Sequence, residues 1–193
     1  NLESIYAFWG ALWLGAVPSM FPTLTEKLDP DLYMDSMAEL TRNSEAKAVL
    51  TTDAFAPELA KRCPCPVYGS SDWLPGCGDQ TENTNMMLRR PKPDEIAFLQ
   101  HSSGTTGLQK GVALSYQAVL NQLASYASAL KLSGQDVIVS WLPLCHDLGV
   151  IAGFIQPIVQ GIPLVLMSPF DWVQHPALLL RAKDAPRDRL TVW

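Results

Sequence analysis

The chain has 193 residues, of which 48% are hydrophobic and 17% charged, so it can bury the core of a globular protein. Nineteen acidic against fourteen basic residues give a net charge of −5, without the Lys/Arg cluster that binding to nucleic acid needs. The four cysteines match neither a zinc site nor a disulfide framework, and we expect reduced thiols in a cytoplasmic protein.

The first third of the chain alternates between helix and strand patterns. Apolar residues at helical spacing predict a core helix over 2–14, closed by Gly15. Asp29 followed by Pro30 is typical of a helix start, and that helix should run to about residue 43. A strand over 47–52 and a helix over 55–62 follow. This succession predicts an α/β fold with helices packed on a mainly parallel sheet.

A polar loop between two short strands is the most informative stretch. Residues 75–93 are rich in Pro, Gly and Asn and should form a surface connection into a buried strand over 96–100. The loop itself reads SSGTTGLQKG over 102–111, and 112–114 is again apolar. Glycines let backbone N–H groups approach an anion, hydroxyls add donors, and a lysine supplies a point charge. We interpret it as a polyphosphate-binding loop borne on a hairpin, against the alternative of a solvated polar turn.

Two standard nucleotide motifs do not fit this loop. A Walker A loop needs glycine directly before its lysine, and Gln109 stands there. The spacing of Gly104, Gly107 and Gly111 is not that of a dinucleotide fingerprint.

A second polar stretch follows a predicted strand. Ser115 should cap a helix over 116–130, and a strand over 137–142 leads to the sequence PLCHDLG at 143–149. His146 and Asp147 would stand where a strand gives way to a helix, the edge at which α/β sheets place ligands. From the residues alone, a substrate-pocket histidine and a helix cap formed by Asp147 are equally supported. A Cys145–His146 nucleophile pair is disfavoured, because neighbours on an extended segment point apart.

The most apolar stretch, 148–167, raises the question of a membrane span. Two glutamines and two prolines near its centre would be costly in lipid. A helix to about residue 159 and a buried strand over 164–167 accommodate the same residues, so we expect no membrane span.

Two motifs carry a family resemblance. SSGTTGLQKGV resembles the signature loop of the adenylate-forming superfamily, which includes acyl-CoA synthetases, fatty-acyl-AMP ligases and adenylation domains. The segment WLPLCHDLG resembles a motif of fatty-acyl-AMP ligases, in which the histidine borders the acyl and adenylate pocket. Gln109 replaces the family's usual proline, which leaves the loop looser, and Cys145 stands where relatives often have an aromatic residue.

The resemblance implies a fold, a reaction and a set of site residues. The chain would be an incomplete part, 1–193, of the large N-terminal domain of a ligase that uses ATP and Mg²⁺ to activate a carboxylic acid, most simply a fatty acid. Coenzyme A or an acyl-carrier protein would accept the acyl group. Lys110 and Thr106 would act in catalysis and His146 would bind substrate. The residues implied in binding the nucleotide are Ser102, Ser103, Gly104, Thr105, Thr106, Gly107 and Lys110.

Several family motifs are absent from the chain. No Tyr-Gly-x-Thr-Glu segment, Thr-Gly-Asp ribose contact, hinge or C-terminal lysine is present, and both ends look cut, so we expect a fragment that makes no acyl-AMP alone. One alternative is an inactive nucleotide-binding or interaction fragment. Another, a hydrolase using His146, lacks the G-x-S-x-G elbow that would carry its nucleophile. The acid, its chain length and the acceptor stay open.

Overall fold

The computed structural model describes residues 2–22, 24, 28–73, 90–102, 110–181 and 189–192. The chain divides into two compact units. The first comprises Asn1–Pro18, Thr23–Arg90 and Ser103–Gly111, and the second comprises Ser19–Pro22, Pro91–Ser102 and Val112–Trp193. Each unit is described by itself below. The expected surface connection over 75–93 lies mostly outside the described residues.

Two helices dominate the first unit. Helix α1 spans Leu2–Trp13 and α2 spans Pro30–Asn43. The predicted cap of α2 is confirmed, since the Asp29 carboxylate accepts hydrogen bonds from the backbone N–H groups of Asp31 and Leu32 at 2.9 and 3.1 Å. Met34, Met37, Ala38 and Leu40 of α2 are buried. The helix predicted over 2–14 is confirmed, but the expectation that it lies in the core is not: Phe8 is its one buried residue, and Leu2, Tyr6 and Trp13 are more than 60% exposed.

A small parallel sheet completes the first unit. Strand β1 (Val49–Leu50) pairs in parallel with β2 (Val67–Tyr68), with Val49 opposite Val67. Helix α3 (Ala56–Ala60) connects them, and α4 (Ser70–Trp73) follows β2. Strand β2 and α4 were not predicted from the sequence, and the predicted strand over 47–52 is reduced to two residues.

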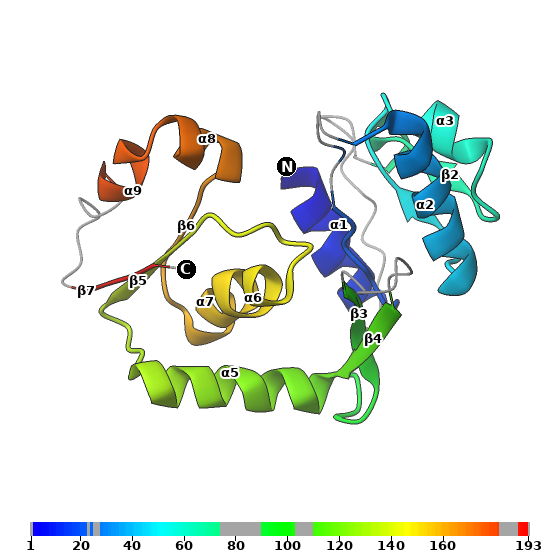
Figure 1. Ribbon diagram of the computed structural model, residues 1–193. Helices are drawn as coiled ribbons and strands as arrows, with labels where there is room; N and C mark the ends of the chain where they lie inside the picture. Colours follow the sequence, from blue (N-terminus) through cyan, green and yellow to red (C-terminus); the bar gives the residue numbers. More distant parts are fainter. Residues whose placement is uncertain are drawn as a thin grey trace, which may run out of the picture. The chain divides into compact units, whose positions relative to one another are not determined.

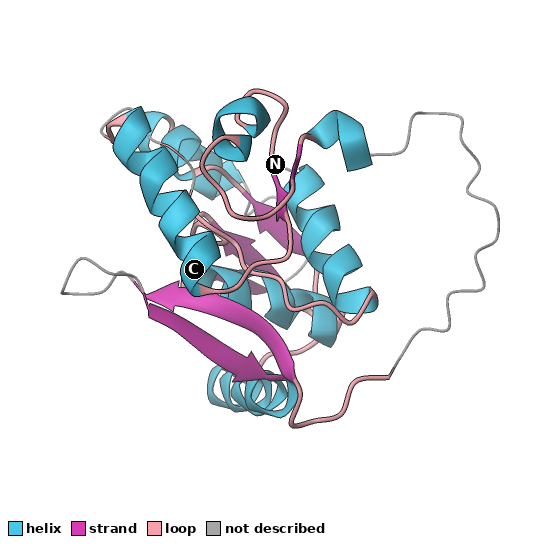
Figure 2. Ribbon diagram, turned by 90° about the vertical axis from the view of Figure 1, so that its right-hand side faces the viewer, coloured by secondary structure: helices cyan, strands magenta, loops and turns pink. Residues whose placement is uncertain are grey.

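The second unit contains the strand before the polar loop and, from Val112 on, the strand after it. Strand β3 spans Ile96–Ser102 and β4 spans Lys110–Ser115, and the two are neighbours in a two-stranded sheet. The N–H groups of Tyr116 and Gln117 donate to the carbonyls of Glu95 and Pro93, which places the end of β4 beside the start of β3. The pair therefore forms a hairpin, seen in Figure 2 as adjacent magenta arrows pointing in opposite directions.

The same unit holds a three-stranded parallel sheet in the order β6-β5-β7. Its strands are β5 (Asp136–Ser140), β6 (Leu164–Leu166) and β7 (Arg189–Val192), and β5 pairs in parallel with both neighbours. All five residues of β5 are buried, as expected for the central strand of a covered parallel sheet.

Helices cover this sheet. Helix α5 (Tyr116–Leu130) begins at Ser115, whose hydroxyl accepts a hydrogen bond from the N–H of Ala118 at 3.2 Å, as predicted. A continuous helical segment runs through α6 (Asp147–Val150), the π-helical turn η1 (Ile151–Ile155) and α7 (Gln156–Gln160). It contacts both β5 and α5, between which it lies in Figure 1. Helices α8 (Pro169–Gln174) and α9 (Ala177–Arg181) follow β6.

The apolar stretch over 148–167 is therefore a helix followed by a strand, as predicted. Within the described ranges, no helix has the length and apolar character needed to cross a membrane.

Candidate nucleotide and acyl site

The hairpin fixes both ends of the predicted phosphate loop. Ser102 is the last residue of β3 and Lys110 is the first residue of β4, so the loop occupies the seven-residue connection between paired strands. The remaining predicted nucleotide ligands, Ser103, Gly104, Thr105, Thr106 and Gly107, lie outside the described residues. Their role stays a prediction from the sequence.

His101, the penultimate residue of β3, is fixed by a segment 82 positions earlier in the chain. Its Nδ1 lies 3.0 Å from the Ser19 hydroxyl oxygen, and its ring packs on Phe21 with centroids 4.8 Å apart and planes inclined by 34°. A parallel backbone bridge between Ser19 and Leu99 adds to this contact. Burial lowers the pKa of His101 below its usual 6.5, so the imidazole is neutral at neutral pH. The sequence analysis missed this contact, because no local spacing links residue 19 to residue 101.

The second predicted stretch forms a tight turn between β5 and α6. The His146 N–H donates to the Pro143 carbonyl at 3.0 Å. Gly149 packs directly on that turn: a Cβ at this position would lie 2.1 Å from the Pro143 oxygen. Only a residue without a side chain fits there, so the glycine at 149 sets the distance between the turn and the helix that follows.

His146 and Asp147 form an exposed pair at the start of this helix. The His146 Nδ1 and the Asp147 Oδ1 are 2.6 Å apart, and the two side chains are 66% and 70% exposed. The same Asp147 oxygen accepts the N–H of Leu148 at 2.7 Å. Helix α6 begins at Asp147 with His146 as its N-cap residue, so Asp147 is the first helical residue and not the cap, which was one of the two alternatives left open by the sequence. A histidine oriented by a carboxylate at a helix N-terminus can hydrogen-bond with a ligand through its second ring nitrogen.

Cys145 differs from an activated thiol. Burial raises its pKa above the usual 9.0, which disfavours the thiolate that a nucleophile requires. The His146 ring nitrogen Nδ1 pairs with Asp147. This geometry agrees with the prediction that Cys145 and His146 are not a catalytic pair.

Two indoles meet at the carboxyl end of the parallel sheet. Trp141 follows β5 directly, Trp172 lies in α8, and their rings stack with centroids 4.4 Å apart and planes inclined by 16°. Parallel pairing of Ser140 with Leu166 brings the exits of β5 and β6 to one edge. This is the edge at which open α/β sheets bind ligands.

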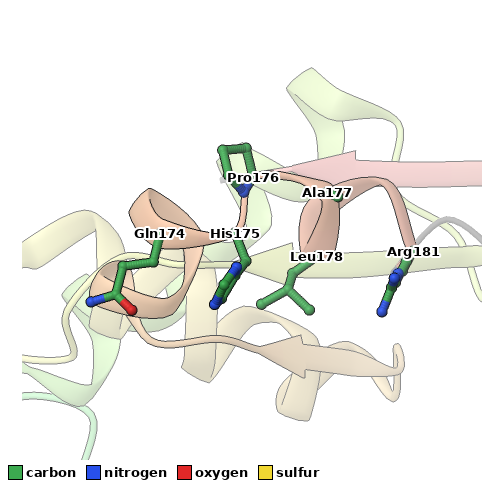
Figure 3. Close-up of a pocket in the computed structure, with 6 residues that line it drawn as sticks. All are labelled: Gln174, His175, Pro176, Ala177, Leu178 and Arg181. Carbon is green, nitrogen blue, oxygen red and sulfur yellow. The ribbon is translucent and has the colours of Figure 1, made fainter.

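A pocket of about 500 Å³ lies at the junction of α8 and α9. Its lining residues fall between positions 174 and 181, outside the phosphate-loop and His146 motifs. Among the residues that line it, Gln174, His175, Leu178 and Arg181 point in the same direction from the ribbon of α8 and α9 (Figure 3). It contains none of the predicted site residues. Over the described residues, no group of three or more His, Cys, Asp or Glu side chains is placed to hold a metal ion.

Comparisons with known proteins agree with the family resemblance. The sequence profile described as AMP-binding enzyme matches residues 1–193. The chain is 30% identical over 192 residues to the long-chain-fatty-acid–AMP ligase FadD26 of Mycobacterium marinum, covering 92% of this chain and 31% of the relative. It is 31% identical to 4-hydroxyphenylalkanoate adenylyltransferase of Mycobacterium tuberculosis, covering 92% and 29%.

A solved structure gives the same result. The fatty acyl-adenylate ligase of Legionella pneumophila, in complex with acyl adenylate and pyrophosphate, superposes with a TM-score of 0.73 at 29% identity, over 94% of this chain and 31% of that one. The α/β fold class predicted from the sequence is thereby confirmed. The chain spans about 31% of the length of FadD26 and of the Legionella ligase.

Proposed function

Because the chain belongs to the family of AMP-binding enzymes, we propose that it is part of a ligase that activates a carboxylic acid with ATP. In the proposed reaction, a carboxylate oxygen attacks the α-phosphorus of ATP. The bond between that phosphorus and the bridging oxygen breaks, so acyl-AMP forms and pyrophosphate leaves. A thiol then displaces AMP from the acyl group. The observation that carries the proposal is the sequence SSGTTGLQKG in the connection of the β3–β4 hairpin.

The loop residues would act through electrostatics and positioning. Backbone N–H groups around Gly104 and Gly107, the hydroxyls of Thr105 and Thr106 and the Lys110 ammonium would hold the β- and γ-phosphates. These donors stabilise the charge that moves onto pyrophosphate as it leaves. Ser102 and Ser103 would contribute further hydroxyls. Mg²⁺ enters the proposal as the counterion of the ATP phosphates.

His146 would contact the reacting carboxylate or the adenylate. Its support is the exposed imidazole at a helix start, with Nδ1 held by Asp147 at 2.6 Å. That contact occupies Nδ1 and leaves Nε2 as the ring nitrogen that can hydrogen-bond with a substrate group. The role is one of binding and orientation, and it needs no proton transfer.

The two curated relatives act on different acids by name, a long-chain fatty acid and a 4-hydroxyphenylalkanoate, at nearly equal identity. We propose a fatty acid, because the LPLCHDLG motif resembles that of fatty-acyl-AMP ligases and because the structural neighbour is a fatty acyl-adenylate ligase. The acceptor would be coenzyme A or an acyl-carrier protein. The free thiols of Cys63, Cys65 and Cys145 suit a reducing compartment such as the cytoplasm. The chain would form the first part of the large nucleotide-binding domain.

The test is acid-dependent formation of AMP and pyrophosphate by the full-length protein that carries this chain. Long-chain fatty acids and 4-hydroxyphenylalkanoates would be compared at matched concentration, with release of pyrophosphate and formation of acyl-AMP both measured. We expect fatty acids to be turned over. Turnover of the 4-hydroxyphenylalkanoate alone would correct the acid class, and no turnover with any acid would overturn the proposal.

A further inference from the structure

The exit of β3 is held by a residue pair that lies outside the phosphate-loop motif. His101 stands one residue before the end of the strand, and the chain enters the loop after Ser102. Segment 19–22 lies along this end of β3 through the Ser19–Leu99 backbone bridge. The attachment is therefore made at the point where the strand passes into the loop.

Three contacts of different kinds coincide there. The Ser19 hydroxyl oxygen and His101 Nδ1 are 3.0 Å apart, the Phe21 and His101 ring centroids are 4.8 Å apart, and the backbone bridge joins Ser19 to Leu99. Because alternate residues of a strand share a face, His101 and Leu99 lie on the same side of β3. The imidazole is half-buried and neutral, so the contact does not depend on a charge.

We propose that His101 is a positioning residue for ATP, which holds the start of the phosphate loop in register through its contacts with Ser19 and Phe21. This inference rests on the proposed function. A loop that binds phosphates through backbone N–H groups requires its first residues at a fixed place, since small displacements of binding groups cost a large part of their effect. Backbone pairing with β4 holds one edge of β3. The side-chain contacts of His101 hold the end of β3 from which the loop starts.

The experiment is steady-state kinetics on the full-length enzyme with His101→Phe, Ser19→Ala and the double variant. His101→Phe keeps an aromatic ring beside Phe21 and removes the hydrogen bond, and Ser19→Ala removes the same bond from the other side. We expect each single variant to raise the KM for ATP about 3- to 10-fold, the range of one hydrogen bond. The KM for the acid should stay unchanged. The double variant should raise the KM for ATP no further than the single variants do, because both substitutions delete the same Ser19–His101 hydrogen bond.

Controls separate positioning from general stability. Ser125→Ala removes an exposed hydroxyl that bonds to the Asn121 carbonyl on α5, and it should leave both KM values unchanged. Ser19→Thr keeps the hydroxyl and should restore the KM for ATP. If His101→Phe does not fold, Ser19→Ala alone carries the test. Unchanged KM values for ATP, or equal changes for ATP and acid, would overturn the inference.

The two proposals fail in different ways. Without acyl-AMP formation by the unmodified enzyme, the proposed reaction is wrong. The positioning role is then judged by ATP affinity in titration calorimetry, where both single variants should weaken binding about 3- to 10-fold. Equal affinities for the variants and the unmodified protein would reject it.

Discussion

Trp141 stacks on Trp172 with ring centroids 4.4 Å apart, and this contact joins the exit of β5 to helix α8. The two residues are 31 positions apart and meet because β5 and β6 are parallel neighbours that end at the same edge. The stack follows directly on the strand that delivers the chain to His146. The first residue of the motif that contains His146 is thus held by Trp172, a residue outside that motif.

Loss of one indole should weaken this edge of the sheet. We expect Trp172→Ala to lower the free energy of unfolding by about 1–3 kcal/mol, from lost burial and ring stacking. The matched control is Trp13→Ala, since Trp13 is 67% exposed; it should change stability by no more than about 0.5 kcal/mol. Urea unfolding of both variants measures the difference. Equal destabilisation by the two substitutions would show that the Trp141–Trp172 stack does not contribute to stability beyond an exposed tryptophan.

Gly149 and Gly10 offer a matched pair of glycine substitutions. An added Cβ at Gly149 would lie 2.1 Å from the Pro143 oxygen, whereas nothing lies within 4 Å of one at Gly10. Gly149→Ala should therefore displace the turn at His146 and cost more than about 2 kcal/mol, in the range of core overpacking. Gly10→Ala, inside α1, should gain up to about 1 kcal/mol from helix propensity. Thermal unfolding gives both values, and a Gly149→Ala protein as stable as the unmodified one would contradict the close approach.

Gln156 is a buried amide at the first position of α7. It is fully buried, and neither polar atom of its side chain has a hydrogen-bond partner within the described structure. Removing an unpaired buried polar group should be neutral or stabilising, so we expect Gln156→Met to raise the free energy of unfolding by up to about 1–2 kcal/mol. Denaturant unfolding is the measurement. A clear loss of stability would show that the amide has a partner.

The burial of His101 predicts a defined pH dependence. Its folded pKa is lowered from 6.5 by burial, so the unfolded chain takes up a proton at a higher pH than the folded protein. The contribution to stability is fully present above the unfolded pKa of about 6.5 and declines as the pH falls towards the folded pKa. His101→Phe should therefore lose less stability than the unmodified protein between about pH 7 and about pH 5. Identical pH profiles from urea unfolding would contradict the shift.

Local chemistry made much of the fold predictable. Asp29 before Pro30 and Ser115 before Tyr116 are side-chain caps, and both helices begin where those residues predict. The apolar run around Ile138 predicted a strand, and it forms β5, the buried central strand of its sheet. Two features were missed for different reasons. Strand β2 is two residues long and forms by pairing with β1, a tertiary contact that no local pattern predicts. The π-helical turn η1 has the same apolar pattern as an α-helix.

In the candidate site too, local sequence motifs were predictable and long-range contacts were not. The sequence located the loop and His146, because each motif is contiguous. It did not find the Ser19–His101 contact or the Trp141–Trp172 stack, since these join residues 82 and 31 positions apart. The sequence left two roles open for this stretch, a substrate-pocket histidine and a helix cap formed by Asp147. The structure shows His146 exposed at the start of α6 and paired with Asp147, a position compatible with binding a substrate.

The central claim is that the Ser102–Lys110 loop holds the phosphates of ATP. The most direct measurement is the ATP affinity and ATP–pyrophosphate exchange of the full-length protein with Thr105→Val, Thr106→Val and Lys110→Ala combined, with Ser125→Ala as control. Loss of one charge-assisted bond and two hydroxyls should weaken ATP binding at least about 100-fold and abolish exchange while the protein stays folded. Affinity and exchange equal to those of the Ser125→Ala control would contradict the account.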